Sequence, residues 1–243
     1  MNPMRRGFAL LGTVLLAALT ACAPSVTTRA SSGLEGENPY ANYTGPRAKA
    51  VVANFICASA QCPSGAGAGI SELLMTALIN TNHFIVYDRS VLAQIQQEAY
   101  LGGKPLNLQG AELLVVGSIT AFEPDAGGTR GGGGGILGGL LGAFGAGQKR
   151  SYVAVDMRIV DAQSGAIVSA FRVEGEATDV DYGGVLGVLV PGAAFGGGLK
   201  QYEKTPMGKA LAVMVSNAVK EIINRTPRSY FKYAPDGKPY QQP

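Results

Sequence analysis

Two glycine-rich stretches without a charged residue constrain this chain more than any other feature. They are residues 131–147 (GGGGGILGGLLGAFGAG) and 183–199 (GGVLGVLVPGAAFGGGL), which hold ten and seven of the chain's 35 glycines. Charged residues stand at their borders, among them Arg130 before the first stretch and Lys200 after the second. Few structures accommodate a segment that is both apolar and rich in glycine.

A membrane-spanning helix fits these stretches poorly, because it needs about 20 apolar residues and each glycine costs roughly 1 kcal/mol relative to alanine. A disordered linker carries Ser, Glu or Lys rather than residues such as Leu140 and Phe144. A membrane strand needs only about 9–11 residues, so residues 127–155 and 174–202 could each form two such strands and a turn. An ordinary surface loop is the alternative to these two hairpins.

Membrane hairpins impose a requirement on the whole protein. Lipid offers no hydrogen-bond partner to the edge of a sheet, so the strands must close into a barrel. Two hairpins supply four strands, whereas the smallest membrane barrels have about eight. The hairpin interpretation therefore predicts that several copies of this chain assemble side by side.

The N-terminus reads as an export signal. Arg5 and Arg6 precede the apolar run 8–19, and Leu19-Thr20-Ala21-Cys22 resembles the lipobox of bacterial lipoproteins. In such proteins the cysteine becomes the acylated first residue, so Cys22 is the predicted lipidation site. No aspartate follows Cys22, which by resemblance predicts sorting to the outer membrane, where several acyl chains hold the protein. An ordinary cleaved signal is the alternative.

Charge and residue usage argue against other classes of function. The formal net charge of +3 includes Arg5 and Arg6, so it falls by two with the signal, and no nucleic-acid-binding surface is expected. No GK[ST] follows the glycines of 131–135, and the only histidine, His83, lies in an apolar run. We therefore expect no catalysis, no cofactor and no metal site.

Periodicity predicts an α+β domain of a small sheet and about three helices. The predicted strands are 48–55, 83–87, 112–119, 151–160 and 166–178, and the predicted helices are 70–80, 89–99 and 205–225. Asp88 is the predicted N-cap of the second helix. The nearly continuous apolar run 112–119 predicts a strand covered on both faces.

Cys57 and Cys62 lie in the polar loop 56–69 between the first strand and the first helix. In an oxidising periplasm two cysteines five residues apart can form a disulfide, and a reduced pair is the alternative. A zinc site is disfavoured because the chain has one histidine and no second cysteine pair.

Three segments carry a resemblance to the CsgG family of outer-membrane lipoproteins, the curli secretion channels. They are SELLMTALINTNHFIVYDRSVLAQIQQE, AELLVVGSITAFE and YVAVDMRIVDAQSGAIVSAF. The resemblance extends from about residue 48 to residue 223 and includes the lipobox. Within the family, the chain is most similar to the holdfast-attachment members. The resemblance implies an outer-membrane ring of nine subunits whose hairpins build one barrel of about 36 strands.

The family's function, implied here by resemblance, is a channel that exports unfolded adhesin or anchor subunits to the cell surface. Its narrowest point is a loop that falls on residues 57–62 of this chain. The predicted constriction comprises Cys57, Ala58, Ser59, Ala60, Gln61 and Cys62. Gln61 takes the family's amide position, whereas cysteines occupy the aromatic positions. The resemblance therefore implies where the constriction lies in this chain, but it does not imply the same aromatic chemistry there.

The predicted organisation follows from these assignments. It comprises a signal peptide (1–21), a lipidated tether (22–47), a first α+β part (48–120, with the pore loop 56–69), hairpin 1 (121–155), inter-hairpin strands (156–173), hairpin 2 (174–203), a C-terminal helix (204–225) and a polar tail (226–243). The competing prediction is a monomeric periplasmic lipoprotein that binds and regulates an envelope enzyme.

Overall fold

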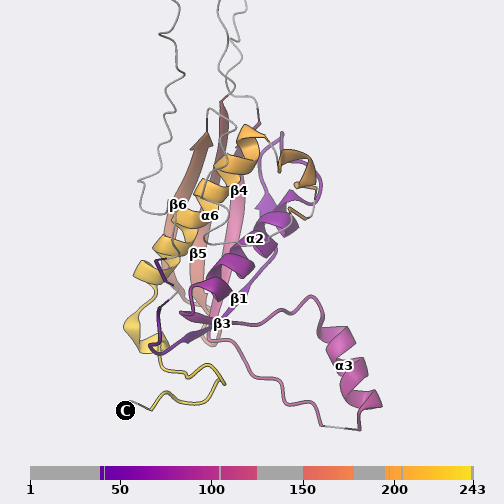
Figure 1. Ribbon diagram of the computed structural model, residues 1–243, viewed down its shortest axis with the longest axis vertical. Helices are drawn as coiled ribbons and strands as arrows, with labels where there is room; N and C mark the ends of the chain where they lie inside the picture. The colour runs from indigo at the N-terminus through magenta and orange to yellow at the C-terminus, as the bar shows by residue number, and fades with distance from the viewer. Residues whose placement is uncertain are drawn as a thin grey trace, which may run out of the picture.

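The computed structural model describes residues 39–40, 42–103, 105–124, 150–177, 195–196, 198–203 and 205–241 (Figure 1). The signal peptide, Cys22 and the greater part of the tether lie outside the described residues. So do the central parts of the two predicted hairpins, residues 125–149 and 178–194.

The fold is a mixed α/β domain built on one open sheet. The strands are β1 (Ala48–Val52), β2 (Ile56–Cys57), β3 (Phe84–Val86), β4 (Leu113–Glu123), β5 (Ser151–Asp161) and β6 (Ile167–Ala177). Their order is β3-β1-β4-β5-β6, and β2 pairs with β4. The β3, β1, β2 and β4 pairings are parallel, whereas β4, β5 and β6 form an antiparallel meander.

Two of the three α-helices that the described residues form cover one face of this sheet, as Figure 1 shows. They are α2 (Ala66–Asn80) and α6 (Pro206–Arg225). The predicted stripe of α6 is confirmed, because all five of its members are buried: Leu211, Val215, Ala218, Val219 and Ile222. The alternation predicted for β5 is also confirmed, with four residues buried on the helix side: Val153, Val155, Met157 and Ile159.

Glycine permits the closest contacts in this core. A Cβ atom on Gly175 of β6 would meet the carbonyl oxygen of Ala210 and would lie 2.7 Å from the Met214 nitrogen in α6. A Cβ on Gly67 of α2 would likewise meet the Phe55 carbonyl oxygen. Helix α6 therefore approaches β6, and α2 the chain between β1 and β2, more closely than a side chain at these positions would allow.

The first two helices differ from their predicted bounds. Helix α2 begins at Ala66, four residues before the predicted start, because small residues in its first turn let it pack directly on the chain after β1. Helix α3 spans Leu92–Leu101, and its N-cap is Val91. The prediction that Asp88 caps it is wrong, since the Asp88 carboxylate accepts hydrogen bonds from the Ser90 N–H and hydroxyl instead.

Strand β4 contradicts the prediction of a sheet covered on both faces. Leu113, Val115, Ile119 and Phe122 are buried under the helices, whereas the residues between them are partly exposed. Among the described residues no helix lies on the second face, and α3 projects away from the sheet (Figure 1).

Candidate functional site

Three strand ends meet at one end of the sheet. Glu123 near the end of β4 pairs with Tyr152 near the start of β5, and Ser151 pairs with Ala177 at the end of β6. The Ser151 hydroxyl donates to the Pro124 carbonyl oxygen at 2.6 Å, which ties the first two strand ends together. The chain thus enters and leaves residues 125–149, and enters residues 178–194, from this one end (Figure 1, top).

The loop predicted as the constriction lies at the same end. Strand β2 pairs with the second half of β4, with Ile56 opposite Ser118 and Cys57 opposite Ile119. Beyond β2, the N–H groups of Ala58 and Ser59 donate to the Ile119 carbonyl oxygen at 2.9 and 3.1 Å. Short parallel pairing therefore anchors the loop beside the stems of both predicted hairpins.

Within the loop, Cys57 and Cys62 are joined as a disulfide whose Cα atoms are 6.0 Å apart. The Cys62 N–H donates to the Ser59 carbonyl oxygen at 3.2 Å, which closes a tight turn inside the bridged ring. Ser59 and Cys62 are half-buried, and the other four predicted constriction residues are exposed: Cys57, Ala58, Ala60 and Gln61. The neighbouring Ile56 is 70% exposed, which is unusual for isoleucine and leaves an apolar group at the loop's base.

The segment returning from the second glycine-rich stretch packs beneath this loop. Phe195 and Leu199 are buried in the core, although both fall in the range predicted as hairpin 2. Gly198 has φ +83°, and a Cβ there would meet the Ser64 carbonyl oxygen of the loop. Sequence reasoning missed this contact because the glycines at 196–198 were all assigned to the membrane. The signal was Phe195 and Leu199, apolar residues on either side of those glycines.

The N-terminal tether joins the domain at the opposite end of the sheet. Tyr43 stacks on His83 with ring centroids 3.6 Å apart, and Tyr40 meets the same ring edge-on at 5.4 Å. The His83 Nδ1 lies 2.9 Å from the Thr81 carbonyl oxygen. Burial lowers the pKa of His83, which is partly enclosed by these rings. His83 is therefore a packing residue of the tether junction.

The segment predicted as a polar tail folds onto that same end. It contains a short 3-10 helix (Arg228–Tyr230), and Tyr233 exchanges backbone hydrogen bonds with Arg47 at 2.7 and 3.0 Å. The Tyr233 hydroxyl donates to Glu112, which raises the pKa of Tyr233 to about 12. The Lys232 ammonium lies 3.0 Å from the same carboxylate. The tail thus clamps the first residues of β1 to the start of β4.

A second tail contact reaches the turn between β5 and β6. The Tyr230 hydroxyl donates to Asp161 at 2.8 Å, and the Ser164 N–H and hydroxyl donate to the same carboxylate. These hydrogen bonds, those from Ser164 first, lower the pKa of Asp161 to about 2. The tail therefore holds the sheet at the end away from the loop and the stems.

No helix among the described residues is long and apolar enough to cross a membrane. In the same part of the chain, no three His, Cys, Asp or Glu side chains lie close enough together to hold a metal ion.

The described residues form a mixed α/β domain with the loop and three strand ends at one end of its sheet. The chain belongs to the CsgG family, because the family model "Curli production assembly/transport component CsgG" matches residues 41–238.

A curated relative is similar to part of this chain. NMB1126/NMB1164 of Neisseria meningitidis serogroup B, named as a lipoprotein, is 29% identical over 159 residues. The match covers 65% of this chain and 63% of that relative. Family and relative together associate the chain with the bacterial envelope.

Solved structures with similar folds are more distant. Protein XCC0632 of Xanthomonas campestris has a TM-score of 0.45 at 9% identity, over 78% of this chain and 90% of its own. CT253 of Chlamydia trachomatis has a TM-score of 0.40 at 16% identity, over 76% and 98%. The PelC dodecamer of Paraburkholderia phytofirmans has a TM-score of 0.35 at 11% identity, over 73% and 92%.

Proposed function

We propose that this protein forms a ring-shaped channel in the outer membrane that exports unfolded adhesin or anchor subunits to the cell surface, as in curli secretion or holdfast attachment. It does so without catalysing a reaction. The lipid on Cys22 holds each subunit to the membrane, and the two glycine-rich stretches supply its membrane strands.

One observation carries this proposal. The loop 57–62 and the ends of β4, β5 and β6 share one end of the sheet. Antiparallel strands that continue from these ends into residues 125–149 and 178–194 would enter the membrane as extensions of the sheet. The loop would then lie directly below the barrel, where a chain passing into it must cross.

The sheet supports assembly into a ring. Its outer strands, β3 and β6, are different strands at opposite edges, so a contact between β3 of one copy and β6 of the next would be heterologous. Heterologous contacts close into rings when the rotation per subunit permits. A ring also supplies the strands that one chain lacks, since a barrel needs about eight or more and each subunit offers four.

The loop sets the chemistry of the passage. The cysteines replace aromatic rings that could stack on a passing chain, and the other five residues of the loop, all small or bridged, surround Gln61. The disulfide would stiffen the loop in place of aromatic stacking, and the opening would be lined by small groups and one amide per subunit. Such a lining does not select for sequence, as expected for unfolded clients.

Imaging of the lipidated protein extracted in detergent tests the proposal. We expect rings with a central opening, and a large species on a native gel that dissociates on heating. A variant lacking residues 131–147 and 183–194 should keep the soluble domain, because Phe195 and Leu199 remain to complete the core. That variant should lose surface delivery of its clients.

The outcome that would overturn the proposal is equally concrete. A monomer on the native gel, together with normal client delivery by the deletion variant, would favour the regulator of an envelope enzyme instead. Circular dichroism and thermal melting of the deletion variant serve as the control, because a misfolded domain would lose delivery for another reason.

A further inference from the structure

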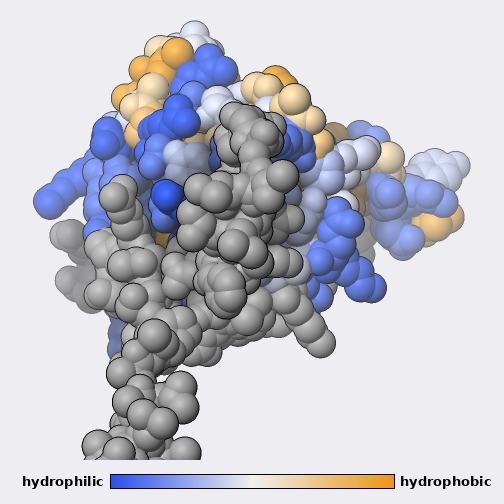
Figure 2. Space-filling view, turned by 90° about the horizontal axis from the view of Figure 1, so that it is seen from above, coloured by the Kyte–Doolittle hydropathy of each residue, from blue (hydrophilic) through white to orange (hydrophobic). Residues whose placement is uncertain are grey.

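Helix α3 is isolated from the rest of the domain. None of its residues is buried, and it carries apolar groups that are exposed: Ile95 by 39%, Tyr100 by 84% and Leu101 by 68%. Val91 before the helix and Leu108 after it are also exposed. In Figure 2 the protrusion at the right, on the side where Figure 1 places α3, is mostly hydrophilic with a small apolar area. An isolated ten-residue helix is marginal in water, so its stability must come from packing.

The strand order and the handedness of the crossovers indicate which face of the sheet α3 should cover. The connection β1–α2–β3 moves to the edge of the sheet, and β3–α3–β4 moves back in the opposite direction across β1. All three strands are parallel, and such crossovers are right-handed in nearly all proteins. Two right-handed connections in opposite directions place their helices on opposite faces, so α3 belongs on the face that α2 and α6 leave open.

That open face carries an apolar row ready for a helix. Leu114 of β4 is opposite Val160 of β5, which is opposite Ile167 of β6. None of the three belongs to the buried core, and Ile167 is 56% exposed. In Figure 2 apolar surface also lies along the upper edge, the side that faces away from the viewer in Figure 1.

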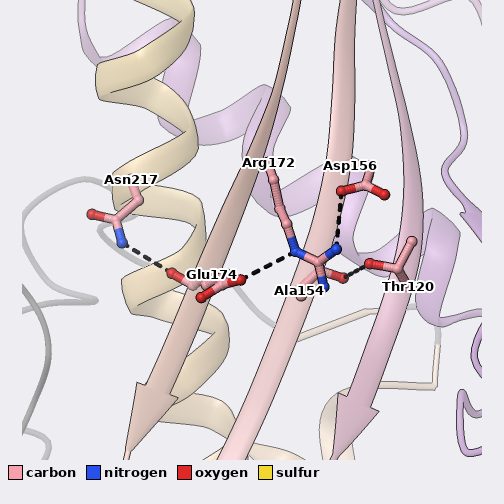
Figure 3. Close-up of polar contacts among 6 residues, drawn as sticks. All are labelled: Thr120, Ala154, Asp156, Arg172, Glu174 and Asn217. Carbon is pink, nitrogen blue, oxygen red and sulfur yellow. Dashed lines mark hydrogen bonds and ion pairs between the residues drawn. The ribbon is translucent and has the colours of Figure 1, made fainter.

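The other half of the open face is already satisfied by polar contacts. Arg172 lies 3.6 Å from Asp156 and 3.1 Å from Glu174, as Figure 3 shows. The Thr120 hydroxyl donates to the Ala154 carbonyl oxygen at 3.4 Å. These groups pair with one another across the three strands, and the apolar row lies beyond them toward the start of β4.

The connectors hold α3 away from its own sheet. Arg89 before the helix donates to the Gln109 carbonyl oxygen after it at 2.8 Å, and the Tyr87 hydroxyl lies 3.1 Å from the Gln109 side-chain oxygen. The tail also closes on this base, because a Cβ on Gly237 would lie 2.6 Å from that same oxygen. The two ends of α3 are thus tied together, and folding back would break these contacts.

We propose that α3 of each subunit docks on the open sheet face of a neighbouring copy of this chain, with Ile95 packed over the row Leu114, Val160 and Ile167. This inference rests on the proposed ring and names the contact that holds it together below the membrane. The contact is heterologous: each copy gives one helix and receives another, which is the arrangement that a ring can close.

Cysteine cross-linking between two tagged versions of the lipidated protein tests the docking. One version carries Ile95→Cys and the other Ile167→Cys, and both are co-expressed and oxidised. We expect a disulfide-linked dimer that contains both tags and is lost on reduction. Gln97→Cys, on the opposite side of α3, is the matched control and should give little of this product when paired with Ile167→Cys.

A double variant separates the remaining outcomes. If Ile95→Cys and Ile167→Cys in one chain give only an internally linked monomer, α3 covers its own sheet and the proposal is wrong. If rings form but no pair cross-links, the proposal is wrong while the channel stands. If the unmodified protein and both cysteine versions all fail to form rings, the proposed channel is itself wrong.

Discussion

At the scale of single residues, the junction of tether and tail is the part of the molecule that pattern reasoning described least well. Phe231 packs against both His83 and Phe84, with ring centroids 6.3 and 5.7 Å apart. Lys49 is almost fully buried, with its ammonium 3.9 Å from the centre of the Tyr233 ring. The run SYFKY at 229–233 is the sequence signal, since three aromatics so close together seldom stay in water.

His83 should make folding sensitive to mild acid. Burial, together with the nearby Arg47 guanidinium, lowers its pKa below the ordinary 6.5, against the opposing hydrogen bond to the Thr81 carbonyl. The unfolded chain therefore binds a proton more readily, so stability is complete above pH 6.5 and falls as the pH drops through the lowered pKa. Urea unfolding of the protein between pH 7.5 and 5.5 measures this loss.

The matched variant is His83→Gln, which keeps a polar side chain of similar reach and cannot titrate in this window. Since the chain has a single histidine, the loss of stability between pH 7.5 and 5.5 should shrink in this variant. Parallel curves for the two proteins over that range would contradict the assignment.

The Cys57–Cys62 bridge should contribute to stability by closing a short ring. For a loop of this length the chain-entropy argument gives about 2 kcal/mol. The free energy of unfolding of the variant Cys57→Ser/Cys62→Ser should be lower by that amount, which a denaturant titration measures. Added protease should also cut this variant faster within residues 58–61. Native protein taken from the periplasm should react with a thiol reagent only after reduction. Free thiols at both positions in that sample would exclude the bridge.

At the scale of elements, hydrophobic periodicity predicted those helices and strands that bury one face against the core. The α6 stripe and the β5 alternation follow from one-sided packing, and both are confirmed. The start of α2 and the course of α3 were not predicted because they depend on contacts with backbone elsewhere in the chain. Gly67 packs against the Phe55 carbonyl, and Arg89 donates to the Gln109 carbonyl oxygen. The apolar run of β4 indicated two covered faces, and within the described chain only one is covered.

The same distinction applies to the candidate site. The position of the loop 57–62 was predicted from a resemblance. Its anchoring on β4 depends on the pairing of β2, a strand of two residues that is too short to produce a recognisable sequence pattern. That the loop shares one end of the sheet with three strand ends follows from strand order and register, which a single sequence does not encode locally.

Contact between β6 and α6 depends on Gly175. The replacement Gly175→Ala would place a methyl group against the Ala210 carbonyl and 2.8 Å from the Met214 Cβ, so the helix must shift. Overpacking of this kind costs about 1–3 kcal/mol. Gly110→Ala is the matched control, because a Cβ there meets nothing within 4 Å. Equal melting temperatures for the two variants would show that α6 does not approach β6 this closely.

At the scale of the whole molecule, the predicted tether and the proposed membrane strands attach to opposite ends of the domain. The tether reaches the domain at Tyr40 and Tyr43 beside His83, whereas the stems leave from Glu123, Ser151 and Ala177. The eleven residues of β4 separate these ends by about 36 Å. If lipid and strands share one membrane, the tether must run back along the full length of the domain.

This geometry sets a minimum tether length. From Cys22 to Tyr40 the extended chain spans at most about 60 Å, and deleting residues 24–33 reduces that to about 28 Å, which is shorter than the sheet. The shortened protein should be lipidated and folded, yet unable to place both lipid and strands in the bilayer. It should therefore give neither a ring on a native gel nor surface delivery of clients. Replacing residues 24–33 with Gly and Ser of equal length preserves the reach and should preserve both activities. Both variants lack the native residues 24–33, so they differ only in the length of the tether. Normal ring formation by the shortened variant would therefore mean that lipid and strands attach at the same end.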